Sequence, residues 1–235
     1  MVVEVPAIAI LPVPFNPEQV IIALAILIPV LVIFNFLLIS EEVFESIGFG
    51  FYQAMLVTAG ALLGSLLNIP LITIDTATIA INVGGAAIPL FVTIGMVARN
   101  RVLLPKTLAA IAVVTIAAHV FATPVPGLGI TMPFYIAPLT GAAVGLLLAR
   151  GCRTAPELAY AGGTMGTLLG ADILNLANPT VFTSLAGGAA TTLSIGGAGI
   201  FDGIFVTGVF SVLLAGYAGR HLRQSAGVCP QEPEE

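Results

Sequence analysis

Charged residues are scarce in this chain, and their scarcity decides its class. Only 8% of the 235 residues are Asp, Glu, Lys or Arg, whereas 58% are hydrophobic and the mean hydropathy is +1.09. Soluble domains carry about 25% charged residues, so the composition excludes an ordinary soluble domain. Several nearly uncharged stretches are about 20 residues long, which matches the thickness of the hydrocarbon core of a bilayer. The sequence therefore predicts an integral membrane protein that contacts lipid.

Several classes of function lack the residues that they need. No basic patch is present, which argues against a nucleic acid partner. The two cysteines and the two histidines show no metal-ligand spacing, and we expect neither a metal nor a cofactor. The Gly-Gly pairs lack the neighbouring Lys-Ser/Thr of a phosphate loop, and no Ser/His/Asp set or zincin motif occurs. The N-terminus has no basic region of the kind that begins a signal peptide.

The hydrophobic pattern predicts an all-α fold, a polytopic bundle of about seven transmembrane helices in a single domain over residues 18–217. The predicted spans are 18–40, 47–67, 79–98, 107–123, 131–149, 157–177 and 191–217. Residues 1–17 contain several prolines and are expected to form an extended lead-in outside the cell. Residues 218–235 are expected to form a disordered cytoplasmic tail.

The positions of the basic residues predict the orientation in the cell membrane. With seven spans, all of them fall on one side: Arg99, Arg101, Lys106, Arg150, Arg153, Arg220 and Arg223. The positive-inside rule makes that side cytoplasmic, with the N-terminus outside and the C-terminus inside. Cys152 and Cys229 would then face a reducing compartment, so we expect no disulfide.

Two short blocks occur twice in the same order. Residues 58–64 (TAGALLG) return as 164–170 (TMGTLLG), and 84–88 (GGAAI) return as 196–200 (GGAGI). Each second block is followed by an echo, LFVT in the first copy and IFVT in the second. Such order favours a duplication, with copies at about 50–98 and 156–212, over chance matches of common residues. An even number of predicted spans separates the copies, which predicts a parallel repeat.

The two copies differ between the second block and its echo, where one has Pro89 and the other has Phe201, Asp202 and Gly203. We expect Asp202 near the middle of the last span, where a carboxylate costs roughly 2.5 kcal/mol or more and by default marks a functional site. The alternative is that Asp202 only caps the second half of a broken helix. The residues expected to open these helices and expose backbone groups are Gly84, Gly85, Pro89, Gly196, Gly197, Gly199 and Gly203.

Four other polar residues are candidates for the same site. Asp172 and Asn175 lie three residues apart on the sixth predicted span and are expected to share a helix face. Asp75 and Asn82 lie in or beside the segment 68–78, which is either an outer loop or a re-entrant segment. If they fold inward, they face Asp172 and Asp202 across the bundle; otherwise Asp75 is a solvated loop acid. His119 is a secondary candidate for proton relay.

Glycines at four-residue spacing predict close helix packing. The sets are Gly60 and Gly64, Gly141 and Gly145, and Gly162, Gly166 and Gly170. Small residues at this spacing let helices approach closely, within the bundle or between copies in a homo-oligomer.

Three runs carry a family resemblance: residues 81–89 (INVGGAAIP), 170–176 (GADILNL) and 196–205 (GGAGIFDGIF). Over about residues 45–217 the chain resembles an uncharacterised family of archaeal and bacterial multi-pass membrane proteins that carries a domain-of-unknown-function label. The resemblance implies a membrane location and a shared architecture. It implies no activity and assigns no role to any residue.

Three functions fit these observations. The first is a small transporter or channel in which intramembrane carboxylates bind a proton or cation. The second is a non-catalytic scaffold or accessory subunit whose glycine-rich faces bind partner helices. The third is an intramembrane aspartyl hydrolase in which Asp172 and Asp202 share a proton and activate water. The motifs around these acids differ from those of presenilin-type proteases, so we expect that the protein is not an enzyme.

Overall fold

The computed structural model describes residues 17–99, 101–149, 154–187, 191–197 and 203–226. The chain divides into two units, residues 1–39 and residues 40–235. The first helix, α1 (Pro17–Ser46), begins in the first unit and ends in the second. Its part in the first unit is strongly apolar, and most of its described side chains there are exposed. The predicted lead-in before Pro17 lies outside the described residues.

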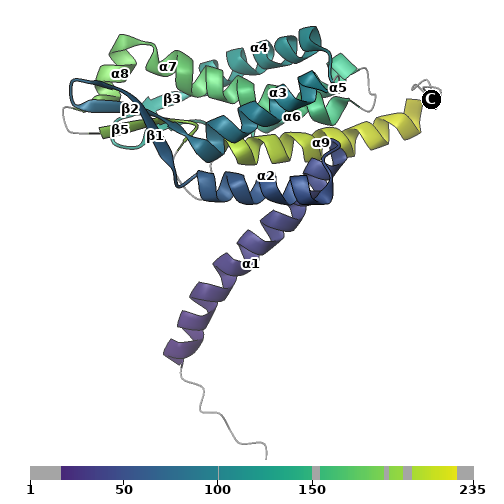
Figure 1. The fold of residues 1–235 in the computed structure, drawn as a ribbon, viewed down its shortest axis with the longest axis horizontal. Helices are drawn as coiled ribbons and strands as arrows, with labels where there is room; N and C mark the ends of the chain where they lie inside the picture. Colours follow the sequence, from purple (N-terminus) through teal and green to yellow (C-terminus); the bar gives the residue numbers. More distant parts are fainter. Residues whose placement is uncertain (1–16, 100, 150–153, 188–190, 198–202, 227–235) are drawn as a thin grey trace, which may run out of the picture. The chain divides into compact units, whose positions relative to one another are not determined.

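The second unit is mostly helical (Figure 1). Its helices are α2 (Phe51–Gly64), α3 (Ile88–Ala98), α4 (Leu104–Phe121), α5 (Ile136–Ala149), α6 (Ala155–Thr167), α7 (Leu174–Leu176), α8 (Pro179–Ala186) and α9 (Gly203–Ala226). Two short π-helices complete the set. The first, η1 (Val83–Ala87), runs directly into α3, and the second, η2 (Leu168–Ile173), joins α6 to α7.

Three of the described helical segments are long and apolar enough to cross a membrane: Val20–Ser46, Leu104–Phe121 and Gly203–His221. Shorter apolar helices cover Phe51–Gly64, Val83–Ala98 and Ile136–Ala149. Each of the seven predicted spans overlaps a described helix, but the number of spans stays a prediction. The last predicted span ends at residue 217, but α9 continues to Ala226 and so includes the first nine residues of the predicted tail.

The fold is not purely helical, and the starts of two predicted spans are strands. Strands β1 (Asn68–Ile74) and β2 (Ala77–Asn82) form an antiparallel hairpin, and β5 (Thr191–Ile195) pairs in parallel with β2. The segment 68–78 is therefore part of a β-hairpin. The alternatives of an outer loop and a re-entrant segment both stay predictions. Its Ile and Thr residues favour strands, but short apolar runs cannot be told from helix ends by periodicity. Strands β3 (Thr123–Val125) and β4 (Gly129–Thr131) form a second small sheet.

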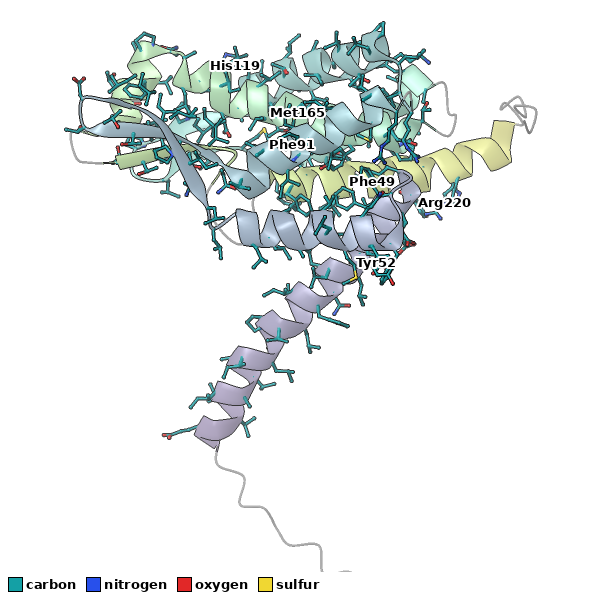
Figure 2. All side chains as sticks on the ribbon, viewed as in Figure 1. Phe49, Tyr52, Phe91, His119, Met165 and Arg220 are labelled. Atoms are coloured by element: carbon teal, nitrogen blue, oxygen red, sulfur yellow. The ribbon has the colours of Figure 1, made fainter. Side chains whose placement is uncertain are left out.

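Helix α6 is the centre of the second unit, since all of its residues are buried. The predicted glycine spacing places helices against it at close range. A Cβ atom at Gly141 would lie 3.1 Å from the Cα of Gly163, and one at Gly162 would lie 3.1 Å from the Cβ of Ala110. In Figure 2 the interior Met165 of α6 contrasts with Phe91 on α3, which is 71% exposed. Close backbone packing thus joins α6 to α4 and α5, whereas large side chains such as Phe44, Met96 and Tyr160 fill other parts of the core and many other large apolar side chains are exposed.

The matching glycines of the predicted repeat make different contacts. A Cβ at Gly64 would lie 3.0 Å from the backbone nitrogen of Gly84, whereas a Cβ at Gly170 would lie 2.9 Å from the Cβ of Ala118 on α4. Both copies do place a strand before the Gly-Gly pair, and these strands, β2 and β5, lie side by side (Figure 1). The duplication stays a prediction.

Gly145 offers a test of the close packing. A Cβ there would lie 2.6 Å from the carbonyl oxygen of Ala155 and 2.8 Å from the amide nitrogen of Ala159, and backbone atoms cannot move aside cheaply. We expect Gly145→Ala to destabilise the protein by about 1–3 kcal/mol and to lower its melting temperature in detergent. Gly95→Ala is the control, because a Cβ at Gly95 of α3 meets nothing within 4 Å. Equal melting temperatures for the two variants would contradict this account of the core.

Candidate functional site

Among the predicted site residues, Asp172 is a carboxylate with a specific hydrogen-bond partner. It lies on η2, is half-buried, and its Oδ2 accepts a hydrogen bond from the backbone N–H of Gly196 at 2.7 Å. Gly196 follows β5 with φ of +99°, a conformation that favours glycine. A Cβ at Gly196 would also lie 2.8 Å from the Cβ of Ala86 on η1. The carboxylate therefore joins the central helix to a turn that only glycine fits well.

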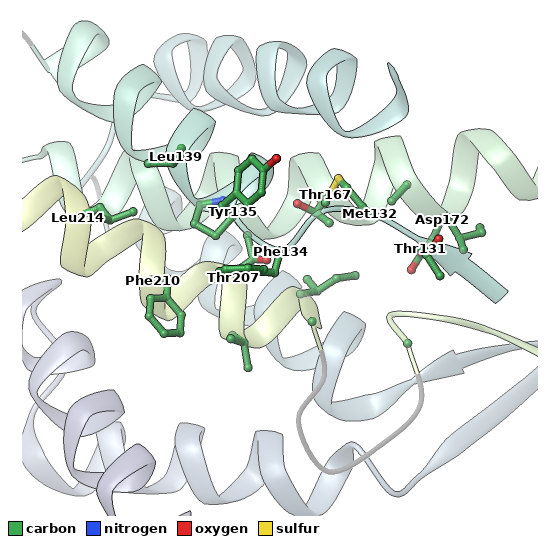
Figure 3. Close-up of a pocket in the computed structure, with 17 residues that line it drawn as sticks. Thr131, Met132, Phe134, Tyr135, Leu139, Thr167, Asp172, Thr207, Phe210 and Leu214 are labelled. Carbon is green, nitrogen blue, oxygen red and sulfur yellow. The ribbon is translucent and has the colours of Figure 1, made fainter. Parts of the chain in front are cut away.

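Two cavities share the wall that contains Asp172. The first has a volume of about 530 Å³ and extends from η2 along α5 and α9 (Figure 3). The second has a volume of about 350 Å³ and is lined by parts of β4, β5 and α8. Residues Ile130, Asp172, Gly197 and Gly203 line both. The carboxylate thus lies between two spaces that could hold a ligand or water.

The two cavities differ in chemistry. The first is mainly apolar, with Tyr135, Phe210 and Leu214 on its walls, and Asp172 is the one charged residue among its described lining residues. Its hydroxyl groups come from Thr131, Thr167, Thr207 and Tyr135. The second cavity is lined by Asp172 together with Thr192 and Ser194. The Asp172 side chain therefore lines both a mainly apolar cavity and a more polar cavity.

Asn175 forms hydrogen bonds with backbone carbonyl groups of η2 and is not among the residues that line the two cavities. Its side-chain nitrogen donates to the carbonyl oxygens of Gly170 and Ala171, at 3.2 and 2.8 Å. The shared face with Asp172 stays a prediction, and the π-helix that contains Asp172 has a wider turn than the α-helix on which that prediction is based. His119 is exposed, and its Nδ1 lies 3.3 Å from the same Gly170 oxygen.

Asn82 is fully buried and acts as the N-terminal cap of η1. Its Oδ1 accepts from the N–H of Gly85 at 2.9 Å, and its Nδ2 donates to the carbonyl oxygen of Ser65 at 2.7 Å and to Oδ1 of Asn68 at 3.1 Å. The Ser194 hydroxyl is 2.6 Å from that same Asn68 oxygen. Asn82 therefore holds the sheet against η1 rather than facing a cavity.

Asp75 lies apart from this group. It is exposed in the turn between β1 and β2, with φ of 52°, so the alternative of a solvated loop acid is the one that the structure supports. Pro89 is buried near the start of α3, directly after η1. Gly84 on η1 approaches α2 so closely that a Cβ there would clash with the carbonyl oxygen of Ala61. The predicted helix break in the first copy thus takes the form of a π-helix.

Asp202 and Gly199 lie outside the described residues. Gly197 and Gly203, the described neighbours of this segment, both line the two cavities.

Sequence reasoning missed most of the cavity lining. Tyr135 comes from the turn just before α5, whereas Phe210 and Leu214 lie four residues apart on α9, and no spacing in the sequence relates these two distant segments. Thr207 is the one partial signal, because it ends the IFVT echo of the predicted repeat.

The bond between Asp172 and Gly196 leads to a stability prediction. Asp172→Ala leaves a part-buried N–H without an acceptor, which costs about 1–3 kcal/mol, so we expect a lower melting temperature in detergent. Asp172→Asn keeps a side-chain oxygen in place and should melt close to the wild type. Asp75→Asn, at the exposed turn, is the control. The account is wrong if Asn at position 172 destabilises as much as Ala, or if Ala has no effect.

One comparison with known proteins gives a match. A model of the family described as "protein of unknown function (DUF1614)" matches residues 51–214, which include Asp172, Gly196 and most of the second unit. No curated protein and no solved structure matches the chain. The expected membership of an uncharacterised family is thereby confirmed. This chain belongs to the DUF1614 family of proteins of unknown function.

Proposed function

We propose that this protein is a small multi-pass membrane transporter or channel whose site centres on the carboxylate of Asp172. The observation that carries the proposal is the position of this carboxylate in the shared wall of two cavities. A passive scaffold needs no such space, and acids within transmembrane segments generally line ion or substrate paths.

The membrane location has support from the three long apolar helical segments. We propose that the shorter apolar helices and the continuous α6–η2–α7 segment complete a bundle of about seven spans. Described basic residues support the proposed orientation: Arg99, Arg101 and Lys106 lie at or between the end of α3 and the start of α4, and Arg220 lies in the last part of α9. The positive-inside rule then makes these ends cytoplasmic.

The setting of Asp172 suits reversible binding of positive charge. Among the described residues, only one of its two carboxylate oxygens has a hydrogen-bond donor, the Gly196 N–H. The described lining of either cavity includes no Lys or Arg that could neutralise it. A proton or a cationic group is therefore the partner that this carboxylate lacks.

We also propose that the parallel pair β2–β5 is the remnant of a duplication. Each strand leads into a Gly-Gly pair, and the register joins Ala77 to Thr191 through Ile81 to Ile195. Rocking of the two copies around a common site is how many transporters with repeats work.

Transport can be tested with purified protein in liposomes that contain a trapped pH-sensitive dye. We expect an acid pulse, or a separate K⁺ or Na⁺ gradient followed with an ion-sensitive dye, to produce a flux above that of empty liposomes. Asp172→Asn should reduce this flux about tenfold or more, because an amide carries neither charge nor an exchangeable acidic proton. Asp75→Asn is the matched control and should leave it unchanged. A flux that Asp172→Asn does not alter would remove this residue from the mechanism.

A further inference from the structure

The first cavity opens among exposed apolar side chains. Phe134, Leu139 and Phe210 line it and are 86%, 53% and 49% exposed. They come from α9, from α5 and from the segment just before α5 (Figure 3). In a membrane-spanning bundle, large apolar side chains that are exposed contact lipid rather than water. The mouth of the cavity between α5 and α9 would therefore open sideways to the hydrocarbon.

We infer that this cavity binds an amphipathic organic cation, an ammonium or pyridinium group on an apolar body, which enters from the lipid phase and places its charge at Asp172. The inference deepens the proposed function and rests on it, since it names the class of substrate for the same site.

The negative charge of Asp172 favours a ligand with a positive charge. Asp172 is the one charged residue among the described residues that line the first cavity. A carboxylate held among apolar walls gains most from a partner of opposite charge. An anionic amphiphile would meet the carboxylate, and no Lys or Arg among the described lining residues would balance the two negative charges. A phospholipid headgroup would bring a phosphate to the same place, so the lining favours a ligand whose only charge is positive.

Size and wall chemistry select the rest of the ligand. A volume of about 530 Å³ is within the range of sites for small organic molecules. Tyr135 and Phe210 offer aromatic faces that suit both alkyl chains and cations. The second cavity, which Asp172, Thr192 and Ser194 all line, adds polar groups to the space around the charged head. The first cavity therefore suits the apolar tail of an amphiphile, and the second cavity suits its charged head.

The absence of tryptophan makes a direct binding test available, because the chain contains none. Phe210→Trp places a single fluorescent reporter on the cavity wall. Phe91→Trp, on the exposed face of α3, is the matched control for simple partitioning of a ligand into lipid. The probe is N-dodecylpyridinium, whose ring quenches tryptophan, in phosphatidylcholine liposomes below the concentration at which the probe forms micelles. N-methylpyridinium carries the same ring and charge without the apolar chain.

We expect saturable quenching of the Phe210→Trp reporter by N-dodecylpyridinium, at concentrations about tenfold or more below those that quench the Phe91→Trp reporter. Adding Asp172→Asn should weaken the binding about tenfold, as expected for loss of one charge-assisted contact. Adding Asp75→Asn should change nothing. Should Asp172→Asn fail to fold, competition gives the same information: dodecyltrimethylammonium should displace the probe, and dodecanol should not.

The inference is overturned if both reporters are quenched alike, if N-methylpyridinium binds as well as its dodecyl analogue, or if dodecanol competes as well as the cation. It is also overturned if Asp172→Asn folds and binds like the parent protein. Loss of proton or ion flux in Asp172→Asn without binding of the amphiphile would refute this inference and leave the proposed function standing. Binding of the amphiphile without flux of any kind would refute the proposed function alone.

Discussion

Backbone groups that are taken away from water must find partners inside the protein, and side chains meet this requirement at the places where the helices depart from α geometry. Asn82 caps η1 through the Gly85 N–H, and Asn175 takes two carbonyl oxygens of η2. Asp172 accepts from the N–H of Gly196, where the chain leaves β5. Each irregular segment thus has a buried or half-buried polar side chain that forms hydrogen bonds with its backbone groups. Of the three, only Asp172 is ionisable and lines a cavity, which is why it alone is a candidate for chemistry.

Helix α6, which leads into η2, is held in place by close packing against α4 and α5. Gly141 and Gly145 bring α5 against α6, and Gly162 does the same for α4. At these glycines no side chain fits between the helices. Large side chains such as Phe44 and Tyr160 fill other parts of the interior, and many other large apolar side chains are exposed or line the first cavity. The packing changes character at η2, where the central helix widens and presents Asp172. A π-helix at this point is a common feature of functional sites. Around it, Gly170 still packs closely against α4, while Thr167 and Asp172 line the first cavity.

Hydropathy was sufficient to predict the class and the approximate helix positions, because uncharged stretches of span length leave few alternatives. It failed at 79–82 and 191–195, since apolar Ile and Thr residues suit a strand as well as a helix start and only pairing with β1 and β2 decides between them. Asp172 could be found because an acid among apolar residues is conspicuous. The roles of Asn82 and Asn175 could not, because they depend on where π-helices interrupt the α-helices. The cavity walls arise from tertiary packing of α5 and α9, which carries no local signature.

The walls of the cavities bear on the kind of cation that the site could favour. A bare metal ion replaces its hydration shell with several oxygen ligands, and among the described residues no group of three His, Cys, Asp or Glu side chains could hold one. A single carboxylate beside an apolar space of about 530 Å³ offers one charge and much hydrophobic surface. Burial of apolar area stabilises a bound ligand by roughly 25 cal/mol for each Å², a contribution that a small hydrated ion cannot use. The charge at Asp172 would then orient the ligand, while the walls provided by α5 and α9 supply most of its affinity.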